Sequence, residues 1–165
     1  MIHDPALPPP FAERFAPLTE VKFSGPRSSF HNCFGCGPGH DIGLRVRTFT
    51  EDGGVLAPIV IPRRFEGPPG AAHGGIVAAY LDEVLAGAAV SHTGRLYVTG
   101  ELTVRYVKPV PIEAPLEMRA RLVDRERRKL FITAECRDGD EIVATCKAIY
   151  ITVDPSRFAG FPDPR

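Results

Sequence analysis

The chain has 165 residues, a length that suits one domain with one hydrophobic core. Its 20 Lys and Arg residues balance 20 Asp and Glu residues, so the net charge gives no reason to expect nucleic acid or an anionic membrane as partner. No apolar run reaches the roughly 18 residues that span a bilayer, and the N-terminus lacks the basic and apolar regions of a secretory signal. We therefore expect a cytoplasmic globular protein.

Proline-rich segments flank the central part of the sequence. Residues 1–30 include Pro8-Pro9-Pro10 and are predicted to form an extended arm, with a short helical turn near residues 11–15. Residues 154–165 carry three more prolines and are predicted to form a similar tail. The folded domain is therefore expected within residues 31–153.

Two strands are predicted before the first long helix. Residues 44–49 alternate apolar and polar side chains, which is the period of a half-buried strand. Asp52-Gly53-Gly54 is a turn signal, and residues 55–61 follow as the second strand. The sequence Gly-Pro-Pro-Gly at 67–70 then predicts a loop.

One helix is predicted from about Gly74 to Ser91. From residue 76 to residue 90 only Asp82 and Glu83 are charged, so the helix is apolar on nearly every face. Such a helix belongs in the centre of a protein. At about 15–18 residues we expect it to be too short to span a membrane.

Four strands are predicted after this helix, at residues 96–107, 116–125, 130–137 and 141–153. Short connections join them, so sequence neighbours are expected to pair antiparallel. One helix wrapped by one curved antiparallel sheet is an α+β arrangement, and it explains the all-round apolar helix. The side chains expected to share one face of their strand are Val98, Gly100, Leu102, Val104 and Tyr106 in the first, and Leu116, Met118, Ala120 and Leu122 in the second.

The start of the helix, His73-Gly74-Gly75, is the first candidate site. Unsatisfied backbone N–H groups and a partial positive charge collect at a helix N-terminus, and glycine lets a ligand approach the backbone. Two adjacent N–H groups aimed at a carbonyl oxygen form an oxyanion hole. The alternative is that the glycines only permit a tight turn into the helix.

Asp82 is the second candidate. An unpaired carboxylate in an apolar helix is costly, and its pKa is expected to rise. Proteins that keep such an acid often use it for acid–base or nucleophilic chemistry. Glu83 is the adjacent competitor, because consecutive helix residues cannot face one direction. For either acid the structural alternative is a buried ion pair or a solvent-facing position.

These residues resemble a known family. His73-Gly74-Gly75, six residues, then Asp82, is similar to the helix motif of the hotdog-fold acyl-CoA thioesterases, most of all the phenylacetate-pathway (PaaI-like) branch. Residues 98–109 resemble the long central strand of that branch, and residues 32–37 with 43–45 resemble a segment found in one of its subgroups. The resemblance covers about residues 31–153 and implies the hotdog fold.

The resemblance implies a thioesterase that hydrolyses a small-to-medium acyl- or aryl-acyl-CoA, with no cofactor beyond the coenzyme A of the substrate. It implies that the N–H of Gly74 or Gly75 polarises the thioester carbonyl, while Asp82 activates water as general base or attacks directly. It also implies a homodimer or a dimer of dimers, with each site drawing its glycine and its acid from different subunits. His73 is expected mainly to support its loop, and the alternative is a catalytic role in which it polarises the thioester.

Substrate-binding groups are expected around this centre. Thr99 or Thr103 is expected to add a polar group from the long strand, and Glu83 lies beside the catalytic acid. Arg105 and Lys108 are candidates for contact with the phosphates of coenzyme A.

One position departs from the family pattern. Many relatives carry an Asn six residues before the His, where it helps to hold the substrate, and this chain has Gly67 there. Glu66 is the polar neighbour that can compensate. The missing Asn is the motive for the main alternative function, a non-catalytic acyl-CoA- or lipid-binding hotdog module. A hotdog hydratase fits less well, because the Asp and His pair of those enzymes has no counterpart here.

The segment Cys33-Phe34-Gly35-Cys36, flanked by His31 and His40, permits a zinc interpretation. A structural zinc needs four well-spaced ligands, and one C-x-x-C with two loosely placed histidines is a weak signal. A thioredoxin-like redox pair would open a helix, whereas this one precedes a predicted strand. We therefore expect no metal and interpret the segment as a loop near the acyl pocket. Two other cysteines, Cys136 and Cys146, are expected in the core.

Overall fold

A computed structural model describes residues 7–22 and 30–158. The chain runs through one short helix, two strands, one long helix and four strands, which confirms the predicted order. Residues 1–6, 23–29 and 159–165 of the predicted arm and tail lie outside the described residues. The elements are α1 (Ala12–Phe15), β1 (Phe49–Glu51), β2 (Gly54–Ile59), α2 (Gly74–Thr93), β3 (Tyr97–Tyr106), β4 (Leu116–Glu126), β5 (Lys129–Asp138) and β6 (Glu141–Thr152).

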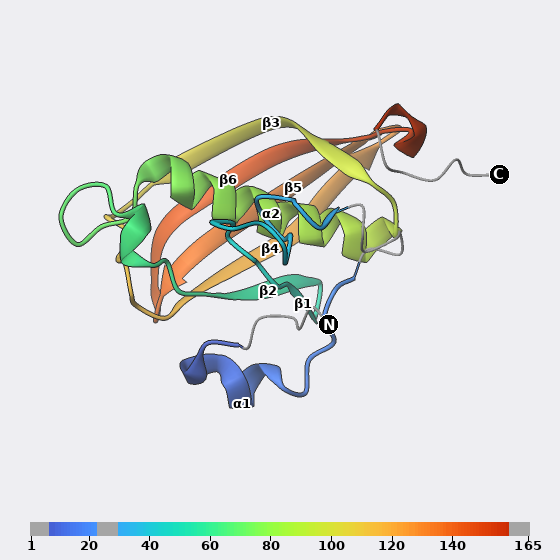
Figure 1. The fold of residues 1–165 in the computed structure, drawn as a ribbon. Coiled ribbons are helices and arrows are strands. Elements are labelled where there is room, and N and C mark those ends of the chain that lie inside the picture. The colour runs from blue at the N-terminus through green and yellow to red at the C-terminus, as the bar shows by residue number, and fades with distance from the viewer. Residues whose placement is uncertain (1–6, 23–29, 159–165) are drawn as a thin grey trace.

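The six strands form one antiparallel sheet in the order β1-β2-β4-β5-β6-β3, curved around α2 (Figure 1). The expectation that neighbouring trailing strands pair is correct for β4, β5 and β6 and wrong for β3, which pairs with β6 instead of β4. The connection after β3 contains Pro109 and Pro111, which cannot donate to a hairpin ladder. The result is that β3 forms one edge of the sheet.

Helix α2 is the core element. It is 20 residues long, which exceeds the expected length, and it ends at Gly94, whose φ of 63° allows the left-handed cap. By length and composition it is the one helix among the described residues that is able to cross a membrane. It packs against β2, β3, β4, β5 and β6 instead, as predicted for a central helix. Its buried side chains are Val77, Tyr80, Leu81, Val84, Leu85, Ala88 and Ala89.

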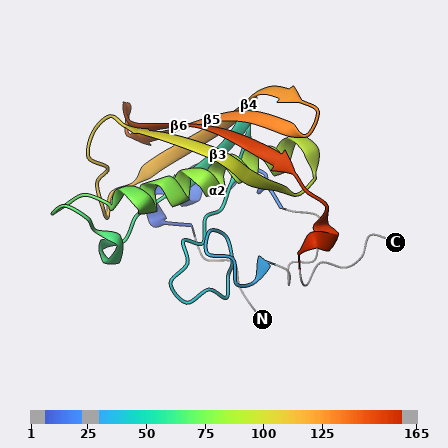
Figure 2. The ribbon, with the colours of Figure 1, turned by 90° about the horizontal axis from the view of Figure 1, so that it is seen from above.

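A segment before β1 covers the other side of α2. Figure 2 shows the sheet, α2 and this segment as three successive layers. Residues 44–48 belong to it and are not a strand, which corrects the prediction for residues 44–49. Arg45 adopts a positive φ of 54°, which interrupts an extended backbone. The N–H groups of Leu44 and Val46 donate to the carbonyls of Phe34 and Gly35, so this segment holds the loop of residues 30–43, here called the cysteine loop.

A β-bulge in β3 shifts the pairing with β6 between Thr99 and Glu101. The extra residue changes which side chains face α2. Before the bulge, Tyr97 is buried and Thr99 contacts the helix; after it, Leu102 and Val104 pack against the core. The single face expected for this strand is therefore wrong on the N-terminal side of the bulge.

The helical turn predicted near residues 11–15 is confirmed as a 3-10 turn followed by α1. Phe11 and Phe15 are buried and form a small second core with Phe49 and Leu56. Phe15 contacts the Phe49 ring edge-on, with ring centroids 5.2 Å apart. The arm thus packs against β1 and β2, at the edge of the sheet.

Leu85 tests how far stability depends on the central helix. It is fully buried in the main core. Leu85→Ala is expected to lower the free energy of unfolding by about 2–5 kcal/mol, because it leaves a cavity that close packing cannot fill. Val123→Ala is the control, since Val123 is 61% exposed on β4 and should change stability by less than about 0.5 kcal/mol. Urea denaturation followed by circular dichroism measures both; equal effects would contradict the assignment of the core.

Candidate active site

Asp82 lies half-buried in the middle of α2, and one of its carboxylate oxygens is held by two hydroxyl groups. The Thr99 hydroxyl donates to Asp82 Oδ1 across 2.7 Å. The Tyr150 hydroxyl lies 2.6 Å from the same Oδ1 and 2.6 Å from the main-chain oxygen of Asp82. No ion pair to Asp82 is found in the described part of the chain, so the acid is oriented by neutral donors.

Tyr150 on β6 is a site residue that the sequence analysis missed. Its ring is buried, and burial together with the neighbouring Asp82 carboxylate raises the pKa of its hydroxyl. The hydroxyl therefore keeps its proton and remains a donor. A buried Tyr hydroxyl needs a hydrogen-bond partner, and a Tyr in a strand expected to be buried therefore indicates that a polar partner lies nearby. The partner itself lies 68 positions away in sequence, which no local pattern encodes.

Of the two threonines predicted to supply a polar group, the structure brings only Thr99 to Asp82. Thr103 follows the bulge and alternates with Leu102 and Val104, which pack inward, so its side chain is exposed on the other face. The bulge therefore decides which threonine contacts the acid.

Thr99→Val is expected to lower kcat by about tenfold in the hydrolysis proposed below, because a hydrogen bond to a charged group contributes about 1.5–3 kcal/mol and Tyr150 remains. Thr103→Val is the matched control on the same strand and should leave kcat unchanged. Steady-state kinetics with one thioester measures both. Equal loss in the two variants would contradict the role of the bulge.

At the start of α2, His73 is the N-cap residue. Its Nδ1 accepts a hydrogen bond from the Gly75 N–H at 3.1 Å, so the imidazole supports the helix start through a backbone amide. The Gly74 carbonyl accepts a 2.6 Å hydrogen bond from the Tyr106 hydroxyl. Among the described residues none accepts from the Gly74 N–H, which makes it the amide that is available to a ligand.

The helix start and Asp82 are far apart within one chain. Eight residues of α-helix separate Gly74 from Asp82, which at 1.5 Å per residue is about 12 Å. A water molecule beside the carboxylate cannot attack a carbonyl held at Gly74 of the same chain over that distance. A site that uses both groups therefore requires two chains.

The loop before the helix has no space for the missing Asn. A Cβ at Gly67 would lie 2.9 Å from the Cα of His73, which is closer than side chains tolerate. Glu66 accepts a 2.7 Å hydrogen bond from the Gly70 N–H and lies near Arg63, so its carboxylate is engaged within its own loop. In this backbone the position that carries Asn in many relatives therefore holds no side chain, and one would fit only if the neighbouring backbone moved.

The two cations proposed for coenzyme A lie away from Asp82. Lys108 forms an exposed ion pair with Glu141, with 2.6 Å between Nζ and Oε1. Arg105 is exposed and has the strand parity of Thr103, so it projects from the face of β3 away from the core.

Glu83 faces a different layer from Asp82. It contacts the cysteine loop, where a side chain at Gly35 would overlap its carboxylate. Burial is the main cause that raises the pKa of Glu83 to about 7, and the adjacent Cys33 thiol adds to it. Glu83, predicted from the sequence as a substrate contact, thus also contacts the cysteines, which its position in the sequence does not indicate.

A cavity of about 1150 Å³ joins these parts of the structure. It lies between α2, the start of β3 and the segment of residues 30–48. Asp82, Glu83, Thr99 and Tyr150 all line it, as do Cys33 and Cys36 of the cysteine loop together with apolar residues such as Val90 and Val98. The cavity thus offers a carboxylate at one wall and an apolar surface beside it.

Residues 69–145 match the family model described as the thioesterase superfamily. This stretch contains the helix start, Asp82 and the strands that pack on α2. Protein RHA08564 of the same superfamily has a solved structure with 28% identity and a TM-score of 0.66, covering 73% of this chain and 60% of that one. Over residues 69–145 the chain is similar to the thioesterase superfamily. The expected hotdog fold, with one helix wrapped by an antiparallel sheet, is confirmed by the observed sheet and helix and by the similarity to this solved structure.

Other proteins similar to this chain carry more specific names. A phenylacetic acid degradation-related protein from Ralstonia eutropha JMP134 is 27% identical, with a TM-score of 0.60, and the match covers 67% of this chain and 86% of that one. Acyl-coenzyme A thioesterase THEM4 from Bos taurus is 31% identical over 94 residues, which cover 56% of this chain and 38% of THEM4. THEM5 from Homo sapiens is 32% identical over 88 residues, which cover 52% of this chain and 35% of THEM5. The match thus spans less than half the length of these two relatives.

Proposed function

We propose that this protein is an acyl-CoA thioesterase that hydrolyses a small-to-medium acyl- or aryl-acyl-CoA. The observation that carries the proposal is the Asp82 carboxylate, which two hydroxyl donors orient at the wall of a cavity large enough for an acyl group. The match of residues 69–145 to the thioesterase superfamily model and the similarity to proteins named acyl-coenzyme A thioesterase support the same reaction. The reaction needs no cofactor beyond the coenzyme A of the substrate.

The reaction follows from the hydrogen bonds of the site. Thr99 and Tyr150 hold Asp82 Oδ1, which leaves Oδ2 to accept a proton from a water molecule. The water oxygen attacks the thioester carbon, and the Gly74 N–H stabilises the oxyanion that forms. Collapse of this intermediate breaks the C–S bond and expels the coenzyme A thiolate, which takes up the proton. The alternative chemistry at the same acid is direct attack by the Asp82 carboxylate.

The site is proposed to form between two subunits. The 12 Å separation within one chain requires Gly74 of one subunit and Asp82 of another. Strand β3 supplies a suitable contact, because it is an edge strand whose backbone groups on one side are open to another strand. Antiparallel pairing of two β3 strands around a twofold axis would also run the two α2 helices in opposite directions. A dimer, or a dimer of such dimers, is the proposed assembly.

The substrate class is proposed from the cavity wall and from one structural relative. The apolar cavity wall fits an acyl or aryl group, and one structural relative is named for phenylacetic acid degradation, which favours the PaaI-like branch. Arg105 and Lys108 are proposed to contact the coenzyme A phosphates from the rim, after Lys108 exchanges its partner Glu141. The proposed compartment is the cytoplasm, where acyl-CoA esters are available.

A panel of acyl- and aryl-acyl-CoA esters, with release of the free thiol as the readout, tests the activity. We expect turnover of at least one ester, with little or none of oxygen-ester analogues. Binding measured by calorimetry without turnover of any ester would overturn the proposal and favour the non-catalytic binding module, for which the absent Asn at Gly67 is the motive.

Mixing two inactive variants tests the shared site. Asp82→Asn chains and Gly74→Pro chains are each expected to be nearly inactive. If subunits are exchanged at a ratio of one to one, half of the dimers are mixed, and each mixed dimer contains one intact site, so about a quarter of wild-type activity should return. No recovery in mixtures shown by mass spectrometry to contain mixed dimers would contradict a site built from two subunits.

A further inference from the structure

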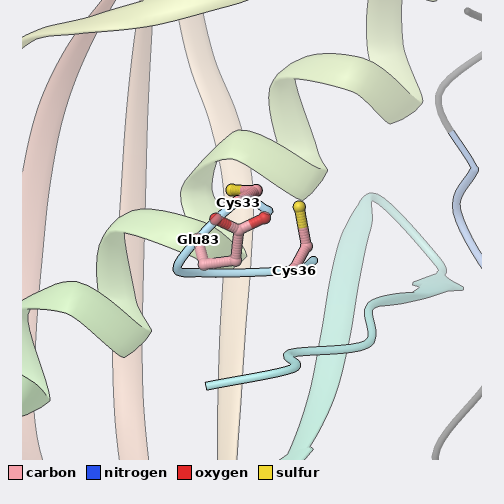
Figure 3. A group of neighbouring side chains, drawn as sticks. All are labelled: Cys33, Cys36 and Glu83. Atoms are coloured by element: carbon pink, nitrogen blue, oxygen red, sulfur yellow. The ribbon is translucent and has the colours of Figure 1, made fainter. Parts of the chain in front are cut away.

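Three side chains of types that can bind a metal ion meet in the lining of the cavity. Figure 3 shows the Glu83 carboxylate between the side chains of Cys33 and Cys36. The two sulfur atoms and a carboxylate oxygen all lie within 4.8 Å of one another. The two thiols come from one loop and the carboxylate from α2, so the cluster joins two layers of the molecule.

The local backbone holds the two thiols on one side of their loop. The Gly37 N–H donates to the Cys33 carbonyl at 2.9 Å, which closes a turn around residues 33–37. The loop passes so close to α2 that a side chain at Gly35 would displace the Glu83 carboxylate. The third donor therefore lies directly against the turn, and Glu83 is partly buried there.

The spacing suits a tetrahedral ion. Zinc binds thiolate sulfur at about 2.3 Å and carboxylate oxygen at about 2.0–2.2 Å, which places the donors of one ion about 3.5–3.8 Å apart. Donors within 4.8 Å of one another reach this spacing by shifts of about 1 Å, which side-chain rotation provides. Two sulfur donors favour zinc or a similar soft ion over Mg²⁺ and Ca²⁺, which take oxygen ligands.

The Glu83 carboxylate also has no cationic side chain as partner among the described residues, which favours binding of a metal cation. In the described part of the chain no Lys or Arg forms an ion pair with Glu83. The exposed position of Cys36 leaves a route for an ion from solvent.

We propose that Cys33, Cys36 and Glu83 bind one Zn²⁺ ion, with a water molecule as the fourth ligand. The ion fixes the cysteine loop to α2 beside Asp82 and so shapes the wall of the cavity. This inference departs from the expectation of no metal, because the third donor is not one of the histidines near the cysteines in sequence. It does not depend on the proposed hydrolysis, and binding can be measured without a substrate.

Cobalt titration of the full, reduced and metal-free chain tests the proposal. Co²⁺ bound by two thiolates in a tetrahedral site gives a sulfur-to-cobalt charge-transfer band and intense visible bands. We expect these bands to saturate at one ion per chain and to disappear when Zn²⁺ is added. Absence of the charge-transfer band in the folded wild-type chain would overturn the proposal.

Single variants assign the ligands. Cys33→Ser and Cys36→Ser should each remove most of the charge-transfer intensity. Glu83→Gln should keep both thiols and still weaken zinc affinity at least about 100-fold, because loss of an outer-shell partner alone costs about 10–100-fold. Zinc affinity is measured by competition with a chromophoric chelator. Wild-type affinity in Glu83→Gln would overturn the three-ligand site, even if the cysteine variants fail to fold.

Two further measurements separate the remaining explanations. Cys136→Ala removes a buried core thiol on β5 and should leave the cobalt bands unchanged, so loss of the bands in this control would contradict the assignment. Intact-mass measurement reports whether Cys33 and Cys36 form a disulfide, which lowers the mass by two hydrogens. A disulfide that forms readily, together with no cobalt band after reduction, would overturn the metal site and identify a redox pair.

Discussion

Asp82→Asn is expected to lower kcat for thioester hydrolysis by about 10²–10⁴-fold, which is the usual contribution of a positioned general base or acid. The asparagine oxygen can still accept the hydrogen bonds from Thr99 and Tyr150, so the side chain should keep its place. What is lost is the ability to take a proton from water. Circular dichroism and calorimetric binding of the thioester should remain close to wild type while turnover fails.

Asp52→Asn is the matched control for this loss. Asp52 is exposed in the turn between β1 and β2, on a part of the chain that does not line the cavity of Asp82. The same change of charge there should leave kcat within a factor of about two, since surface substitutions away from special features are usually near neutral. Nearly full turnover in Asp82→Asn would refute the proposed base, whatever the control does.

Gly74→Pro should lower kcat by about 10²–10³-fold, the cost of removing one oxyanion-hole donor. The change is unusually selective at this position. Gly74 is the first helical residue, where proline is favoured and where the N–H makes no bond within the helix. His73 has φ −62° and ψ 134°, an extended conformation that a following proline accepts. The helix should therefore form with only the donor missing.

Gly74→Ala separates loss of the donor from added bulk. A Cβ at this position would lie 3.4 Å from the Tyr106 ring, which is an ordinary contact after a slight adjustment. The alanine variant keeps its N–H and should retain most of the wild-type kcat. If the alanine and proline variants are equally impaired, the effect is steric and the Gly74 N–H is not the oxyanion donor.

The sequence was sufficient for the parts of the molecule that depend on local pattern. The apolar helix with two acids predicts a central helix, and a sheet must then surround it. The His73-Gly74-Gly75 motif lies at the helix start because glycines and a capping side chain favour that position. These features depend only on residues that are close together in the sequence, so the sequence alone predicts them.

The bounds of the strands and the side chains that face the core depend on backbone irregularities, which the nearby sequence does not reveal. One bulge decides that Thr99 faces Asp82 and Thr103 does not, although both lie an even number of residues after the start of the strand. Residues 44–48 alternate in burial like a strand, but the positive φ of Arg45 prevents a regular ladder. In both cases contacts with other segments decide the local backbone.

The composition of the site depended on long-range contacts. The partner of Tyr150 is fixed by the pairing of β6 with β3 and by the packing of both on α2. The Glu83 contact with Cys33 and Cys36 arises because the cysteine loop crosses the far side of the helix. Side chains separated by this much sequence are brought together by the three layers, and periodicity carries no information about them.

The pairing of β3 with β6 also has a kinetic meaning. Strand β3, which follows α2, pairs only with β6, the last strand in the sequence, so the apolar helix stays partly uncovered until nearly all of the domain has left the ribosome. Loop closure over such separations is slow, and late closure favours all-or-none folding over stepwise assembly. Nascent chains that end before β6 are therefore expected to expose α2 and to depend on chaperones.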